Sequence, residues 1–179
     1  MTRFVVILTT LLLCSCSSVP LGTMLELRSF SKDDFVTIQP EDLRAKIQLD
    51  EPVRADVASV ALALELTTEK GIREFKFPLR LLREEKIAPV AGFFSTSAGK
   101  TEYTLKLSDE AIENFMATQQ IIRDEKTGSL SFSVATGFEK LPNEITEIGL
   151  SVFLKLSEEK GFITLFDDAK LEIKHDGRA

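Results

Sequence analysis

Two Ser-x-x-Lys segments, Ser97 to Lys100 and Ser157 to Lys160, carry the residue types of serine acyl-transfer chemistry at a suitable spacing. In that chemistry the serine opens a helix, so that the lysine one turn later lies beside the hydroxyl and takes its proton. Neither segment begins a helical pattern. A Lys-Thr-Gly segment at 126–128 matches another part of the same set, but only 25 residues separate it from Lys100, too few for the intervening domain. We therefore expect a turn at 126–128 and no acyl-transfer site.

A second candidate is the segment GFFSTSAGKT, residues 92–101, which ends like a phosphate-binding loop. That loop needs a glycine five residues before the glycine of Gly-Lys-Thr, so that backbone N–H groups can surround the phosphates. Phe94 stands at that position. The residues that follow alternate as in a strand, whereas the bound anion must face the N-terminus of a helix. The spacing predicts a glycine-containing loop and no nucleotide site.

Four adjacent acidic pairs could supply the acid and the base of glycoside cleavage. Adjacent residues of a strand point to opposite faces, so we do not expect these pairs to converge on a substrate. His175 is the only histidine, and a catalytic triad or a multi-histidine metal site therefore lacks its parts. We expect no enzyme activity, no cofactor and no metal, and a hydrolase is the least favoured alternative. The pairs are Asp33–Asp34, Glu84–Glu85, Glu158–Glu159 and Asp167–Asp168.

Apolar residues alternate with polar or small residues along most of the chain after residue 24. That period of two predicts strands with one buried face and one wet face. Turn signals between the alternating runs predict about eight or nine strands. The runs lie at 43–49, 60–66, 75–79, 103–107, 130–134 and 148–156, followed by a hairpin into 162–166 and a last strand at 169–173.

One segment, 109–123, breaks the period of two. Ile112, Phe115 and Ile122 recur there at helical steps, and Ser108 can cap the first turn. The pattern predicts an amphipathic helix that lies on a sheet by its apolar stripe.

The fold class follows from these elements, together with a short helical turn that Pro40 predicts at 39–43. We expect a mainly β domain, with β-sandwich-like antiparallel sheets and one amphipathic helix at about 109–123. The alternative is an α+β fold with the helix on one face of the sheet.

Phe93 and Phe94 stand next to each other in a Gly- and Ser-rich stretch. Adjacent residues of a strand cannot both face one core, so one of the two rings is a candidate contact for a partner protein or an apolar ligand. Core packing against the helix is the default interpretation.

The two cysteines, Cys14 and Cys16, follow Arg3 and an apolar run of ten residues, Phe4–Leu13. A charge, an apolar core and small residues in that order are typical of a secretory signal. The run is too short for a membrane-spanning helix, which needs about 20 apolar residues. The segment LCSC, residues 13–16, resembles the lipobox of bacterial lipoproteins, with leucine three residues before the modified cysteine.

This resemblance implies that residues 1–15 are a signal peptide and that Cys16 is lipidated after cleavage. Cys14 fits less well, because Leu13 precedes it where the family has a small residue. Two or more acyl chains hold a protein stably at a membrane. Ser17, in place of an aspartate, implies sorting to the periplasmic face of the outer membrane.

Loss of residues 1–15 would remove Arg3 and no acid, so the formal charge would change from −6 to −7. An acidic surface argues against nucleic acid, whose phosphates require Lys and Arg. We expect a short tether at 16–23 and one β-rich periplasmic domain at 24–179, a size that suits a single core. That domain contains no cysteine, so its stability must come from apolar packing.

The predicted localisation in the envelope and the incomplete sets of catalytic residues together favour a non-enzymatic binding or assembly module of the bacterial cell envelope. Its expected contacts are the membrane, through the lipid anchor, and an envelope protein partner, with no nucleic acid and no nucleotide. The alternative function is a carrier of a lipid or other apolar ligand, held between the sheet and the helix.

Overall fold

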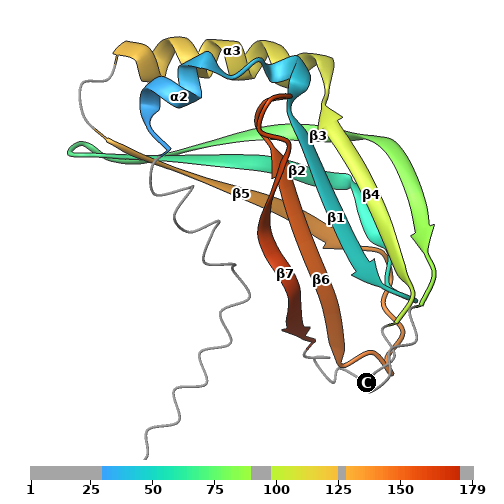
Figure 1. The fold of residues 1–179 in the computed structure, drawn as a ribbon. Coiled ribbons are helices and arrows are strands. Elements are labelled where there is room, and N and C mark those ends of the chain that lie inside the picture. Colours follow the sequence, from blue (N-terminus) through green and yellow to red (C-terminus); the bar gives the residue numbers. More distant parts are fainter. Residues whose placement is uncertain (1–29, 90–97, 125–127, 174–179) are drawn as a thin grey trace, which may run out of the picture.

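The computed structural model describes residues 30–89, 98–124 and 128–173. These residues confirm the mainly β fold: seven antiparallel strands form one curled sheet, in the order β5-β2-β3-β4-β1-β6-β7, with two α-helices (Figure 1). The strands are β1 (Arg44–Asp50), β2 (Ala55–Thr68), β3 (Gly71–Ile87), β4 (Lys100–Leu107), β5 (Ser129–Phe138), β6 (Glu147–Lys155) and β7 (Phe162–Glu172).

Strand β3 joins the two halves of the sheet. Its first part, Gly71–Pro78, pairs with β2, and its second part, Leu79–Ile87, pairs with β4. The register shifts between Leu81 and Arg83, which leaves Leu82 as an extra residue on β3. A bulge of this kind increases the local twist and bends the strand. The sheet therefore curls, and its two halves enclose one core.

The predicted strands are present, but their number is smaller than expected. The segments 162–166 and 169–173 belong to the single strand β7, which continues through Asp168 by a register shift. Asp168 has a φ of 49°, and its N–H donates to Ser151 Oγ at 3.0 Å. The residues between the two predicted strands, Asp167 and Asp168, lie at a bulge in one continuous edge strand.

The predicted helix is confirmed as α3 (Asp109–Asp124). Ser108 Oγ accepts from the N–H of Ala111 at 3.1 Å, as expected of a cap. The helical turn at Pro40 is also present, as the short 3-10 helix η1 (Pro40–Asp42). Within the residues that the structure describes, no helix combines the length and apolar character needed to cross a bilayer.

A further helix, α2 (Lys32–Thr37), was not predicted. Ser31 caps it: the Ser31 side chain accepts from the N–H of Asp34, and the Asp34 side chain accepts from the N–H of Ser31. This reciprocal capping box was visible in the sequence as Ser-x-x-Asp. The helix has only six residues and one fully buried side chain, Phe35, so its apolar periodicity was too short to detect.

Aromatic rings fill the contact between the helices and the sheet. The ring of Phe115 on α3 lies 4.9 Å from that of Phe35 on α2 and 5.0 Å from that of Phe77 on β3, centroid to centroid. All three side chains are at most 1% exposed. Tilted aromatic pairs at this separation add stability beyond the area that they bury.

Gln119 fastens α2 to α3. Its Nε2 donates to the carbonyl oxygens of Phe35 and Ile38, both at 2.9 Å, at the C-terminal end of α2. The side chain is buried. Carbonyl groups at a helix end have no partner within the helix, so a buried end needs such a donor.

We expect the Gln119→Leu variant to lose about 2 kcal/mol or more in the free energy of unfolding, because two buried carbonyls lose their donor. Urea denaturation of the two variants Gln119→Leu and Gln120→Leu measures this. Gln120 is the exposed neighbour on the same helix, so its substitution should change stability by less than about 0.5 kcal/mol. Equal losses in both variants would contradict this role of Gln119.

Candidate functional site

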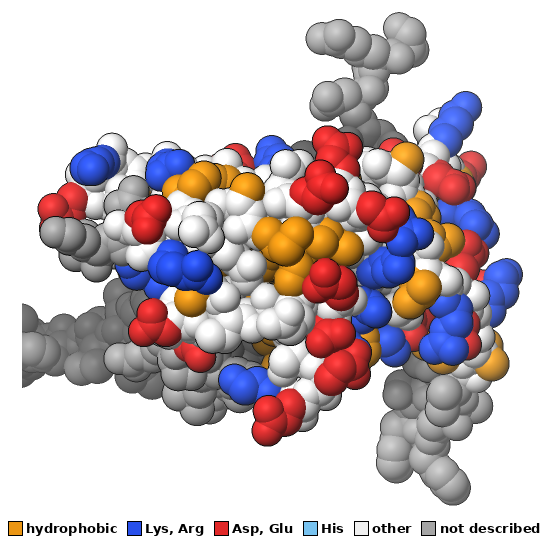
Figure 2. All heavy atoms as spheres, turned by 90° about the horizontal axis from the view of Figure 1, so that it is seen from above, with side chains coloured by type: hydrophobic (Ala, Val, Ile, Leu, Met, Phe, Trp, Pro, Cys, Tyr) orange, Lys and Arg blue, Asp and Glu red, His pale blue; other side chains and the backbone are white. Residues whose placement is uncertain are grey.

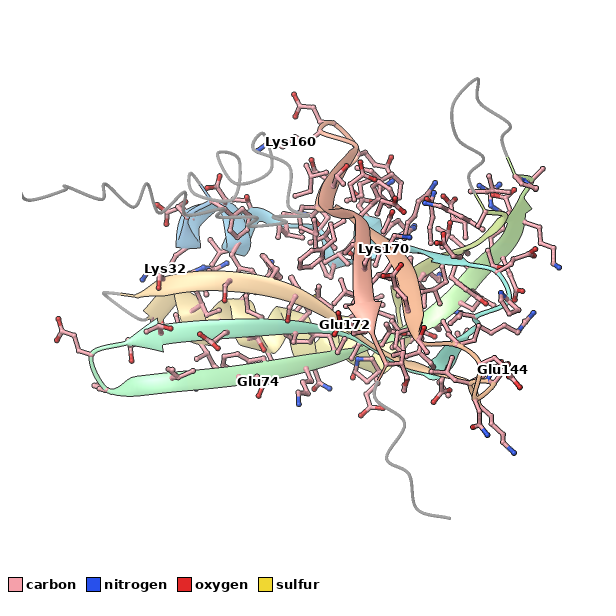
Figure 3. All side chains as sticks on the ribbon, turned by 90° about the horizontal axis from the view of Figure 1, so that it is seen from below. Lys32, Glu74, Glu144, Lys160, Lys170 and Glu172 are labelled. Carbon is pink, nitrogen blue, oxygen red and sulfur yellow. The ribbon has the colours of Figure 1, made fainter. Side chains whose placement is uncertain are left out.

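A pocket of about 320 Å³ lies between the α2–η1 segment and the turn that joins β6 to β7. Phe30, Ile38, Leu156 and Ile163 supply apolar side chains to its wall. Figure 3 labels Lys160 on the β6–β7 turn that closes one side. The volume is at the lower limit of small-molecule sites, which commonly measure about 300–1,000 Å³.

The charged residues of the pocket are mainly acidic: Asp34, Asp42 and Glu159 against Lys160. Hydrogen bonds from the backbone and side chain of Ser31, at 2.8 and 2.7 Å, lower the pKa of Asp34 below its usual 3.8. Its carboxylate is therefore ionised and fixed in place near neutral pH. The pocket suits a group that is apolar in part and carries positive charge.

Phe30, the first described residue, connects this pocket with the edge of the sheet. It contributes to the pocket wall, and its ring packs edge-on against Phe132 of β5, with centroids 5.3 Å apart. Phe132 also lies 5.9 Å from Phe35 of α2. Phe30 therefore lies on the inner face of the sheet, beside the pocket.

Lys100, the second member of one Ser-x-x-Lys segment, lies in an ionic cluster at the end of β4. Its Nζ is 3.3 Å from Asp168 Oδ1 and 3.9 Å from Asp50 Oδ1. Lys170 Nζ lies 3.4 Å from Asp50 Oδ2. Gly149 packs against Asp50, where a Cβ atom would collide with the carboxylate. The cluster links strands β1, β4, β6 and β7, which are neighbours only in the folded sheet.

The other Ser-x-x-Lys segment closes the β6–β7 turn. The backbone N–H of Lys160 donates to Ser157 Oγ at 3.3 Å, and Glu158 pairs with Lys155. The hydroxyl of Ser157 thus serves the turn, and the segment does not open a helix. The serine and the lysine have the same sequence spacing as in the catalytic motif, but they lie on a turn and not on the first turn of a helix.

The adjacent carboxylates of β3 have separate basic partners. Glu84 lies 3.0 Å from Arg54 Nη2, and Glu85 lies 3.1 Å from Arg83 Nη2. Asp34, of another pair, completes the capping box of α2 and also lines the pocket, as does Glu159 of a third pair. Glu84 and Glu85 are thus held in separate ion pairs, whereas Asp34 and Glu159 reach the same pocket, where the Asp34 carboxylate accepts hydrogen bonds from Ser31.

A polar cluster that sequence reasoning did not single out lies between β1 and β4. Lys46 Nζ and Gln48 Nε2 each lie 2.8 Å from an oxygen of the buried Glu102. Burial raises the pKa of Glu102, but the hydrogen bonds from Lys46 and Gln48 outweigh it, so the pKa lies below its usual 4.5. All members have partners within the cluster, which is consistent with a structural role.

The face of the molecule over α3 carries a small hydrophobic patch with acidic side chains around it (Figure 2). Exposed hydrophobic side chains on α3 are Met116 and Ile121, which are 46% and 38% exposed. Isolated exposed side chains of this kind are ordinary on protein surfaces.

Several residues from the sequence analysis lie outside the described residues, among them Cys14, Cys16, Phe93, Phe94, Ser97, Lys126 and His175. The lipidation of Cys16 and the contact through Phe93 or Phe94 therefore stay predictions. Among the described residues, no group of three or more Asp, Glu, His or Cys side chains could hold a metal ion.

No protein-family model matches the chain, and neither curated proteins nor solved structures give a match. The site is therefore argued from its own geometry.

Proposed function

We propose that the chain is a non-enzymatic, lipid-anchored binding module of a bacterial cell envelope, and that the pocket beside Phe30 receives a basic segment of an envelope protein. The observation that carries this proposal is the pocket itself: three carboxylates and one ammonium surround a wall that is partly apolar. A lysine or arginine side chain, with an apolar stem and a charged end, matches such a lining.

The proposed anchor places this pocket close to a membrane. Thirteen residues separate Cys16 from Phe30, and a fully extended chain of that length spans at most ~45 Å. A lipid on Cys16 would thus keep the pocket within reach of proteins at the same membrane surface. Sorting to the periplasmic face of the outer membrane is part of the proposal and follows from Ser17 after the lipobox.

The non-enzymatic part of the proposal is supported by the partners of the residues that could do chemistry. Lys100 is held by Asp50 and Asp168, and Ser157 serves a turn. An acyl-transfer base must instead lie beside the hydroxyl that it deprotonates.

A lipid or apolar-ligand carrier is the less favoured alternative. The expected ligand site of such a carrier lies between the sheet and the helix. There the ring of Phe115 contacts those of Phe35 and Phe77, and all three are buried. A ligand there would have to displace these rings. The pocket beside Phe30 has charged residues on its wall, which suits a basic side chain better than a hydrocarbon chain.

We expect metabolic labelling with palmitate to require Cys16. The Cys16→Ser chain should lose the label and its membrane fractionation, since the thioether cannot form. The matched control is Cys14→Ser, which should keep both, because this cysteine leaves with the signal peptide. Label that persists in Cys16→Ser would contradict the proposed anchor.

The pocket is tested by a photocrosslinking amino acid at Thr37, on its wall, in the full chain in its membrane. We expect one repeatable envelope protein to be captured, and we expect Asp42→Lys with Glu159→Lys to reduce capture at least tenfold by reversing the charge of the wall.

The matched control reverses the same number of charges on the β2–β3 hairpin, by Glu65→Lys with Glu74→Lys, and should leave capture unchanged (Figure 3 labels Glu74). Capture that survives reversal in the pocket, or that falls equally in both double variants, would speak against the pocket as the binding site.

A further inference from the structure

The open sheet has two edge strands, β5 and β7. Among the described residues, β5 pairs only with β2, and β7 pairs only with β6. Each edge therefore presents a row of main-chain N–H and C=O groups on its free side. Such a row is a template for another strand, and proteins normally protect it with charges, proline, bulges or a cover.

Strand β7 is protected in two ways. It carries four charged residues in its second half, Asp167, Asp168, Lys170 and Glu172, all exposed. Its register also shifts twice against β6, and Asp168 takes a positive φ. An irregular, charged edge is a poor template for regular pairing.

Strand β5 lacks charges along its whole length, and its pairing with β2 shifts only at its C-terminal end, beyond Ala135. Its sequence, SLSFSVATGF, contains no charged residue and no proline over ten residues. Its pairing with β2 runs without a shift from Ser129 to Ala135. On the inner face Leu130, Phe132 and Val134 are only partly buried, although they pack against the core. The strand thus leaves both hydrogen-bonding groups and apolar surface incompletely covered.

We propose that β5 pairs antiparallel with β5 of a second copy of this chain, so that one continuous sheet runs through a symmetric dimer. The two-fold axis passes midway between one residue of β5 and the same residue of the second copy. Inner-facing residues of one copy then lie opposite inner-facing residues of the other. Leu130, Phe132 and Val134 of the two copies then continue one apolar row. The outer face brings together only small side chains, those of Ser129, Ser131, Ser133 and Ala135.

Charge favours a second copy at this edge over the second half of β7. The chain has a formal charge of −6, so two copies repel each other, and a contact surface without charged side chains adds least to that repulsion. Self-pairing of β5 brings no ionised side chains of the strand together. Self-pairing of the second half of β7 would bring together three acids and only one base from each copy, Asp167, Asp168 and Glu172 with Lys170.

The position of Phe30 fits this symmetry. The two-fold axis of an antiparallel pair within a sheet is perpendicular to the sheet, so both copies keep their inner faces on the same side. Phe30 packs on Phe132 at that inner face. Phe30 of both copies therefore lies on the same side of the continuous sheet, which is what two lipid anchors in one membrane require; this step rests on the proposed function.

Cysteine substitution on the outer face of β5 tests the contact in the full chain in its membrane. Residues directly opposite in an antiparallel pair lie within disulfide distance. We expect Ser131→Cys, Ser133→Cys or the double variant to form a disulfide-linked species of twice the monomer mass. If the two copies of Ser131 or of Ser133 face each other across the axis, the corresponding single variant forms the disulfide. If the two copies of Phe132 face each other, position 131 of one copy lies opposite position 133 of the other, and the double variant forms it.

A second measurement keeps the test independent of that geometry. Light scattering of the purified full chain in detergent should give twice the monomer mass for the parent chain. The Ser133→Lys variant, which adds a charge to the β5 edge, should give the monomer mass. Gln120→Lys is the matched control, because Gln120 is exposed on α3, away from both edge strands, and this variant should remain dimeric.

The contact is overturned if no cysteine variant links and the parent chain has the monomer mass, or if the cysteines link to a different protein. The parent chain without added cysteine should show no linked species, since the proposed anchor consumes its thiol. A disulfide-linked species in the parent chain would count against the proposed lipid anchor. In that case light scattering alone tests whether β5 forms the dimer contact.

Discussion

The structure depends on one strand that belongs to both halves of the sheet. Because β3 pairs with β2 by its first eight residues and with β4 by the remainder, the bulge at Leu82 bends the whole sheet around a single core. A bent sheet that does not close leaves two edges, and the helices can cover only its inner face. The position of the pocket and the exposure of β5 both follow from that incomplete closure.

The packing of α2 and α3 on the sheet fixes the position of the pocket wall. Phe115 holds the rings of Phe35 and Phe77 together, and Gln119 binds the end of α2, so α2 cannot shift relative to the sheet without breaking buried contacts. The segment that follows α2 forms one wall of the pocket, and the β6–β7 turn forms the other. Residues more than 110 positions apart in the chain thus meet at one site, fixed by core packing rather than by local sequence.

Periodicity was sufficient to predict the strands and α3, since alternation and capping are local properties of the sequence. It could not predict that 162–173 forms one strand, because the bulge at Asp168 depends on the Ser151 hydroxyl of the neighbouring strand. It also missed α2, whose signal was a capping box without a long apolar stripe. The pocket and the cluster around Asp50 depend on strand order, which no single segment encodes. Asp34 shows how one residue can serve a helix capping box and a pocket wall together.

The two edges of this sheet differ: β5 is uncharged and is proposed to pair with a second copy, whereas β7 is irregular and charged in its second half. Hydrogen–deuterium exchange of the full chain in detergent measures this most directly, through the amides of each edge strand that point away from the sheet. The account predicts that these amides in β5 exchange as slowly as those of β2, whereas those of β7 exchange rapidly. Rapid exchange of the outward amides in both edges alike would contradict it.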